Sequence, residues 1–173
     1  VVVPARGGLG EDVEKQADTV AASLAKKLGG SYRLLNLPDD LGLESAASVR
    51  EEPRIKQVLD TIRQARVVVH GVGTALEMAR RRNLSEAEIV HIQQLGAVGE
   101  SFGFYFNSAG EVVYATSSLG LRLADLSRAP AVICVGGGAS KAQALSAVLR
   151  NGFSHIVVTD EGAAREIKHE SGR

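Results

Sequence analysis

Short apolar runs rich in β-branched residues alternate along the chain with longer stretches in which apolar residues recur at helical spacing. The short runs predict strands at residues 1–3, 32–37, 66–70, 131–135 and 155–159. The longer stretches predict helices at residues 11–28, 53–65, 74–82, 85–95, 121–128, 140–150 and 160–168. Because the strands are almost continuously apolar, both faces of their sheet should be covered. The pattern therefore predicts a three-layer, Rossmann-like α/β fold, with a mostly parallel sheet and helices on both faces.

Two features qualify this picture. Residues 102–106 and 112–115 flank Asn107-Ser108-Ala109-Gly110, which predicts a hairpin within the otherwise parallel pattern. The chain also opens on Val1-Val2-Val3-Pro4, which has the pattern of a strand already under way. We therefore expect further sequence upstream, so that the N-terminal part of the fold is missing here. With no internal repeat and no linker composition, residues 1–173 are predicted to be a single domain.

Composition and charge exclude several classes of protein. Apolar residues make up 45% of the chain, and 20 Lys and Arg balance 20 Asp and Glu, which argues against a chain-wide electrostatic grip on nucleic acid. Cys134 is the single cysteine, so it forms no internal disulfide, and its apolar run predicts a buried thiol in a reduced, cytoplasmic setting. No apolar run has the length of a membrane span.

Polar or glycine-rich segments follow four of the predicted strands. They are residues 4–11, 70–74, 136–141 and 159–162. In open α/β sheets, ligands bind outside the carboxyl ends of the strands, where these segments should gather. Turn formation alone would explain one or two of them, and four together favour a ligand site.

The strongest of these segments is Gly136-Gly137-Gly138-Ala139-Ser140-Lys141. Glycines let backbone N–H groups approach a ligand, and the start of the next helix favours an anion. Lys141 adds a positive charge, so the segment suits a phosphate. The alternative is a tight turn in which Ser140 merely caps the helix. The spacing is not that of a Walker A loop, and nothing indicates ATP.

Basic residues supply further candidates. Arg6 follows the first strand among Gly7 and Gly8, where its guanidinium could bind a phosphate or carboxylate with two N–H groups; a surface arginine in a turn is the alternative. Gln16, on the next helix, could reach the same ligand or lie in solvent. Residues 80–82 form the only run of arginines. They are either a solvated helix end or a source of one inward-pointing arginine that binds an anion.

The remaining polar residues indicate no dinucleotide or metal site. Gly71 and Gly73 begin a glycine pattern whose third position is Leu76, which argues against NAD. Glu100 stands among small residues before the hairpin, where it could accept hydrogen bonds from sugar hydroxyls or act as a general base. The four histidines have no metal-ligand spacing, so zinc is not expected.

Taken together, these segments resemble the effector-binding domain of SorC-family bacterial transcription regulators. The resemblance covers the whole chain and is carried by Val3-Pro4-Ala5-Arg6-Gly7-Gly8-Leu9-Gly10-Glu11, His70-Gly71-Val72-Gly73, Ala97-Val98-Gly99-Glu100-Ser101-Phe102-Gly103, residues 136–142 and Thr159-Asp160-Glu161-Gly162-Ala163-Ala164. It implies the fold of the NagB/RpiA sugar-phosphate isomerases and CoA transferases, without their catalysis. It also implies a phosphorylated sugar as ligand, with fructose 1,6-bisphosphate the first choice.

The resemblance implies that five residues bind the effector: Arg6, Gln16, Arg81, Glu100 and Lys141. With the strand-end argument, the predicted effector-binding residues are Arg6, Gly7, Gly8, Gln16, Gly71, Gly73, Arg81, Glu100, Gly136, Gly137, Gly138, Ser140 and Lys141. No catalytic residue, metal or cofactor is predicted. The family's Gly-Gly-Thr-Thr phosphate loop and winged-helix DNA reader would lie upstream of Val1, and Ala139 stands where a relative can have Ser.

Three functions remain open at this point. The first is a regulatory sensor that forms a homo-oligomer, a dimer or a tetramer, and contacts DNA only through an upstream domain, with no membrane partner. The second is an active sugar-phosphate isomerase, for which Glu100 and Asp160 are the candidate acid and base. The third is a purely structural oligomerisation domain, which leaves the repeated glycine segments unexplained.

Overall fold

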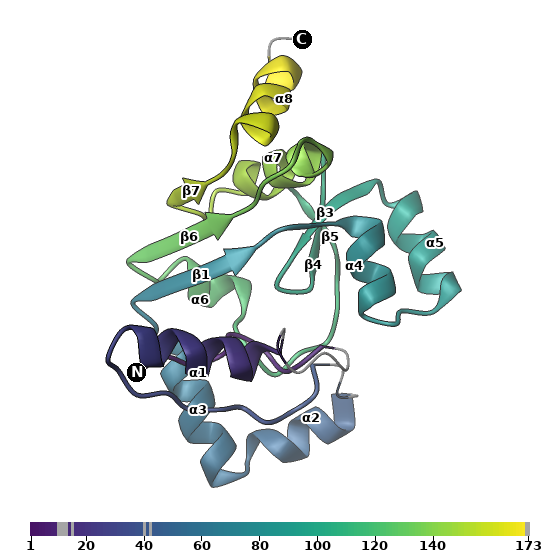
Figure 1. Cartoon of the computed structure of the whole chain (residues 1–173). Coiled ribbons are helices and arrows are strands. Elements are labelled where there is room, and N and C mark those ends of the chain that lie inside the picture. The colour runs from purple at the N-terminus through teal and green to yellow at the C-terminus, as the bar shows by residue number, and fades with distance from the viewer. Residues whose placement is uncertain (10–13, 15, 40, 42, 172–173) are drawn as a thin grey trace. The chain divides into compact units, whose positions relative to one another are not determined.

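The computed structural model describes residues 1–9, 14, 16–39, 41 and 43–171. Its internal contacts divide the chain into two compact units (Figure 1). The first unit comprises Val1–Ala65 and Thr116–Asp125, and the second comprises Arg66–Ala115 and Leu126–Arg173. Each unit is described by itself. The prediction of a single domain therefore stays a prediction.

The first unit is built mainly from helices α1 (Ala17–Lys27), α2 (Leu43–Arg50) and α3 (Pro53–Arg63). α3 was predicted, and the sequence explains its start: Pro53 occupies the first turn, and the Glu52 carboxylate accepts a hydrogen bond from Ile55 N. α1 begins later than its predicted start, and residues 11–13 and 15 of the predicted range lie outside the described residues. α2 was not predicted.

The two strands predicted for the first unit pair only at isolated positions. Val2 forms a parallel bridge with Tyr32, and Gly8 forms one with Pro38. Gly8 N donates to Leu37 O at 2.9 Å, and Asp39 N donates to Gly8 O at 3.0 Å. The two segments therefore run parallel, as predicted, and the second bridge sets Gly8 beside the turn that carries Asp39.

The second unit contains the predicted parallel sheet. Its strands β1 (Val67–Gly71), β6 (Ala131–Val135) and β7 (Ile156–Val158) lie in the order β1-β6-β7 (Figure 1). One face buries Val68, His70, Val132 and Cys134. All three runs were predicted, because each is short, apolar and rich in β-branched residues. The α/β fold class is thus confirmed.

The predicted hairpin belongs to a larger antiparallel sheet. β4 (Phe104–Asn107) and β5 (Val112–Ala115) form the hairpin, and β3 (Ala97–Ser101) and β2 (Gly73–Thr74) extend it to the order β2-β3-β4-β5. Phe102 and Gly103 connect β3 to β4 with φ of 54° and 79°. Two positive φ angles in a two-residue loop match the twist of the flanking strands.

Helices pack against this antiparallel sheet. α4 (Ala75–Arg81), α5 (Glu86–Gln94) and α7 (Ala142–Arg150) all contact β3. A capping box begins α5, with Ser85 and Glu88 each accepting a backbone N–H of the other. Gly99 of β3 is required for the contact with α7, since a Cβ there would lie 2.8 Å from Ala144 O.

Three elements complete the description. The short helix α6 (Leu123–Leu126) spans the boundary between the two units, and α8 (Glu161–Ser171) follows β7. A 3-10 turn, η2 (Ala139–Lys141), precedes α7. In the part of the chain that the structure describes, no helix combines the length and the apolar character needed to cross a membrane.

Candidate functional site

The glycine segment after β6 forms a loop that leads into a helix, as predicted. Gly136 N donates to Val158 O at 3.0 Å, so the loop begins as a continuation of the parallel sheet. Gly138 then turns the chain with a φ of 92°, a value that favours glycine. Lys141 N donates to Gly138 O at 3.0 Å, which closes η2 before α7 begins. Backbone N–H groups at the start of a helix favour an anion, and the role of this loop in effector binding stays a prediction.

Ser140 does not cap the helix in the way that the alternative reading required. The residue before η2 is Gly138 and the residue before α7 is Lys141, so Ser140 lies inside the 3-10 turn. Its side chain is exposed, and Lys141 is half-buried. Both residues therefore stand at the start of α7, and their contact with an effector stays a prediction.

Asp160 contacts this loop from the end of β7. Its Oδ2 accepts a hydrogen bond from Gly138 N at 2.7 Å, and its Oδ1 accepts one from Ala163 N at 2.8 Å. The backbone hydrogen bonds from Ala163 and Gly138 hold the pKa of Asp160 below its ordinary value. The carboxylate therefore stays ionised at neutral pH and links the loop to the first turn of α8.

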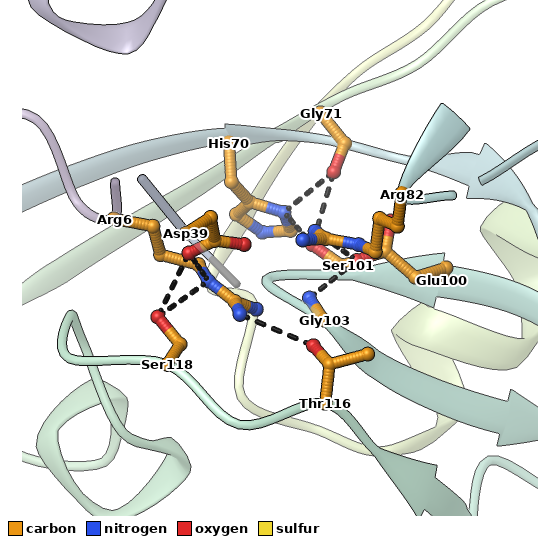
Figure 2. Close-up of polar contacts among 10 residues, drawn as sticks. All are labelled: Arg6, Asp39, His70, Gly71, Arg82, Glu100, Ser101, Gly103, Thr116 and Ser118. Carbon is orange, nitrogen blue, oxygen red and sulfur yellow. Dashed lines mark hydrogen bonds and ion pairs between the residues drawn. The ribbon is translucent and has the colours of Figure 1, made fainter. Parts of the chain in front are cut away.

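Glu100 forms a buried ion pair with Arg82 in the second unit (Figure 2). Arg82 Nη2 lies 2.7 Å from Glu100 Oε1, and the residues are 9% and 2% exposed. Gly103 N also donates to Glu100 Oε1. The inward-pointing arginine of the basic run is thus Arg82, whereas Arg81 is exposed. A contact of Arg81 with the effector stays a prediction.

The apolar spacing of α4 distinguishes Arg82 from the other arginines of the run. Ala75 and Ala79 are the buried residues of α4. Arg82 follows them at the spacing of one helical face, so the face that enters the core continues into this arginine. The apolar periodicity of α4 therefore separates Arg82 from Arg81, which lies off that face.

His70, at the end of β1, belongs to a buried polar cluster in the same unit (Figure 2). Its Nδ1 lies 2.8 Å from Ser101 Oγ, and its Nε2 lies 3.1 Å from Ser154 Oγ. Ser101 Oγ also donates to Gly71 O at 3.0 Å. Burial lowers the pKa of His70, so the ring is neutral at physiological pH. No sequence motif indicates this cluster, because Ser101 and Ser154 are 31 and 84 positions from His70.

The two glycines around the end of β1 have structural partners. Gly71 contributes its carbonyl oxygen to the His70 cluster. Gly73 pairs across the sheet with Glu100, and a Cβ at Gly73 would collide with the side chain of Met78. The contact with Met78 explains the glycine at position 73, whereas a Cβ at Gly71 would lie 3.8 Å from Val135 O and would fit. The predicted role of both glycines in effector binding stays a prediction.

Arg6 is buried in the first unit, so it is not a surface arginine in a turn. Its Nε donates to Asp39 Oδ1 at 2.9 Å and to Ser118 Oγ at 3.0 Å, and its Nη2 donates to Thr116 Oγ1 at 3.2 Å (Figure 2). Arg6 and Asp39 are 7% and 3% exposed. The carboxylate that the guanidinium binds belongs to the chain itself, and the contact of Arg6 with an effector stays a prediction.

The neighbours of Arg6 are also fixed by packing. A Cβ at Gly7 would lie 2.6 Å from Leu37 O, and a Cβ at Gly8 would collide with the amide of Gln16. Gln16 is the residue before α1, and its Nε2 donates to Leu9 O at 3.1 Å. Gly7, Gly8 and Gln16 therefore stabilise the segment that carries Arg6. Their contacts with an effector stay predictions.

The structure thus distributes the predicted residues between the units. Arg6, Gly7, Gly8 and Gln16 belong to the first unit, and the other predicted residues belong to the second. Among the described residues, no group of three or more His, Cys, Asp or Glu side chains could hold a metal ion.

Comparison with known proteins identifies the family. The family model described as "Putative sugar-binding domain" matches residues 1–167. The chain belongs to this family of sugar-binding domains. It is 47% identical over 165 residues to the Central glycolytic genes regulator of Bacillus subtilis (strain 168), which covers 95% of the chain and 48% of that protein. The same protein of Priestia megaterium gives the same identity and coverage.

A solved structure agrees with this assignment. The crystal structure described as "the putative SorC family transcriptional regulator from Enterococcus faecalis" is 45% identical and superposes with a TM-score of 0.88, covering 96% of the chain and 68% of that structure. The predicted resemblance to the effector domains of SorC-type regulators is therefore confirmed. The sugar-binding domain spans about half the length of the curated relatives that it matches.

Proposed function

We propose that this sugar-binding domain senses a phosphorylated sugar, with fructose 1,6-bisphosphate or a related glycolytic compound as effector. The observation that carries the proposal is the loop 136–141, in which Gly138 with its φ of 92° turns the backbone into the start of α7 beside Lys141. A helix start with a nearby lysine favours phosphate. The relatives named as regulators of central glycolytic genes support a ligand from glycolysis.

The residues take distinct roles in this proposal. The loop and Lys141 bind one phosphate, Arg81 binds a charged group, and Glu100 accepts hydrogen bonds from sugar hydroxyls. Arg6 and Gln16 are proposed to contact the effector as well. The ion pair with the buried Arg82 fixes the direction of the Glu100 carboxylate, which supports this role.

We further propose that the domain acts within a longer cytoplasmic regulator. Effector binding would favour one state of a homo-oligomer, a dimer or a tetramer, and thereby change the affinity of an upstream DNA-binding domain. The balance of 20 basic and 20 acidic residues in this chain fits a domain that leaves DNA contact to another part of the protein. A ligand that binds both states equally would have no regulatory effect.

We propose a sensor rather than a sugar-phosphate isomerase. An isomerase needs an acid and a base that exchange protons with the substrate. Asp160 is a poor proton donor, because backbone hydrogen bonds keep its pKa low. Glu100 is held by Arg82 and by Gly103 N. Turnover of ribose 5-phosphate or glucosamine 6-phosphate by the intact protein would contradict this proposal.

The direct test is calorimetric titration of the intact protein with fructose 1,6-bisphosphate, fructose 6-phosphate, glyceraldehyde 3-phosphate and unphosphorylated fructose. We expect saturable binding of at least one phosphorylated sugar and none of fructose. Lys141→Ala should weaken binding by about 1–3 kcal/mol through loss of a charge-assisted contact, whereas Lys56→Ala, at an exposed position of α3, serves as the control. The absence of binding with every phosphosugar would rule out the proposal.

A further inference from the structure

Asp160 joins two segments of the second unit through a single carboxylate. One oxygen accepts the N–H of Gly138 at 2.7 Å, and the other accepts the N–H of Ala163 at 2.8 Å. Gly138 belongs to the loop after β6, and Ala163 to the first turn of α8. A residue that served only as a helix cap would need the second contact and not the first.

The contact between Asp160 and the loop is also sterically close. A Cβ at Gly137 would lie 2.6 Å from Asp160 Oδ2, so any side chain there would push the carboxylate off the loop. Gly137 lacks the positive φ seen at Gly138, and an alanine at position 137 is therefore free of that backbone strain. The absence of a side chain at Gly137 is thus explained by Asp160.

We infer that Asp160 positions the phosphate loop, by fixing Gly137 and Gly138 so that the turn Ala139–Lys141 is presented to the ligand. This inference rests on the proposed function of the loop. Asp160 already accepts the N–H of Gly138, so the ligand phosphate is held by the N–H groups of the turn that follows and by Lys141. Asp160 acts through the loop and is not itself a ligand contact.

Asp160→Asn tests the inference in the intact protein. An asparagine offers one oxygen and one NH₂ group, so it cannot accept from both Gly138 N and Ala163 N. We expect the affinity for fructose 1,6-bisphosphate, measured by calorimetry, to fall about tenfold. Removal of a negative charge beside an anion would by itself raise the affinity, so a loss reports the disturbed loop. Unchanged or tighter binding would overturn the inference.

Glu52→Gln is the matched control, because Glu52 also caps a helix, α3, through its carboxylate. It should leave the affinity unchanged, and an equal loss in this variant would count against a specific role of Asp160. Gly137→Ala supplies the second arm. It should weaken binding to a similar degree, and the double variant should be little worse than either single variant. Additive losses would mean that the two residues act separately, against the inference.

Hydrogen exchange provides a measurement that needs no ligand. The Gly138 amide should exchange faster in Asp160→Asn than in the wild-type protein, because it loses its acceptor. Absence of phosphosugar binding by the wild-type protein would remove the proposed function, yet this rate would still decide whether Asp160 holds the loop. Faster exchange supports that role, and an unchanged rate overturns it.

Discussion

The carboxylate of Glu100 pairs with Arg82 and not with its neighbour Arg81. The Nη2–Oε1 distance is 2.7 Å, and the side chains are 6% and 3% exposed. Arg82 continues the buried face of α4, whereas Arg81 is exposed. Two adjacent arginines therefore have different environments, and substitution of each should have a different effect.

Arg82→Ala should lower the free energy of unfolding by about 3–5 kcal/mol, because it leaves the Glu100 carboxylate buried without its partner. Arg81→Ala should change it by less than about 0.5 kcal/mol, as for an ordinary surface position. Urea denaturation of the two variants measures both values. If Arg81 binds the effector as proposed, Arg81→Ala should still weaken phosphosugar binding.

A double variant provides the control for Arg82. Arg82→Met with Glu100→Gln removes both charges together, so it should be more stable than Arg82→Met alone, which leaves the carboxylate unpaired. If the double variant were as unstable as Arg82→Met, the loss would not come from the unpaired carboxylate.

Much of the fold was predictable because its signals are local. β1, β6 and β7 are short apolar runs, and the Ser85–Glu88 capping box marks the start of α5. β3 was missed, because Gly96–Gly103 has neither an apolar alternation nor a β-rich composition. Pairing with β4 and the fit of Gly99 against α7 make it a strand, and both are non-local. α2 was missed because its sequence has no clear apolar stripe. Among its residues whose burial is described, Ala46 is the buried apolar one.

The site was predictable in part for the same reason. The loop 136–141 follows from its glycines and from its place after a strand. The partners of Arg6 could not be predicted, because Asp39 is 33 positions away and Thr116 is 110 positions away. No periodicity or motif links residues at such separations, so the burial of Arg6 appears only when the first unit is folded.

Arg6→Ala is expected to reduce stability as well as any effector binding. It leaves Asp39, 3% exposed, without its cation, which should lower the free energy of unfolding by about 3–5 kcal/mol. Asp39 keeps one hydrogen bond in this variant, because Ser118 Oγ also donates to its Oδ1 at 2.9 Å. Chemical denaturation measures the free energy of unfolding. Calorimetric titration under conditions in which the variant is fully folded measures its affinity for the effector. A fully stable Arg6→Ala variant would contradict the buried pair.

The thiol of Cys134 should be unreactive in the folded protein. Burial raises its pKa to about 11, so the thiolate that reacts with disulfide reagents is scarce at neutral pH. We expect an aromatic disulfide reagent at about pH 8 to label Cys134 only as urea unfolds the chain. The labelling curve should follow the loss of circular dichroism, and rapid labelling of the native protein would disprove the prediction.

His70 should make stability depend on pH in the range near neutrality. Burial is the main cause that lowers the pKa of His70 in the folded protein. The unfolded chain takes up a proton on this ring below about pH 6.5, and the folded protein does so only at lower pH. In that window the unfolded state binds more protons, so stability is full above the unfolded pKa and falls as the pH drops through the window.

The variant His70→Gln isolates this effect. Glutamine can hydrogen bond to Ser101 and Ser154 and does not titrate, so its stability should vary less between about pH 5.5 and 7.5 than that of the wild-type protein. Asp160, Asp125 and Glu88 have lowered pKa values, which moves the titration of these carboxylates further below the window. Urea midpoints measured across the window for both proteins provide the comparison. Parallel pH profiles would mean that His70 is not the titrating group, because the wild-type slope would then have to arise elsewhere in the chain.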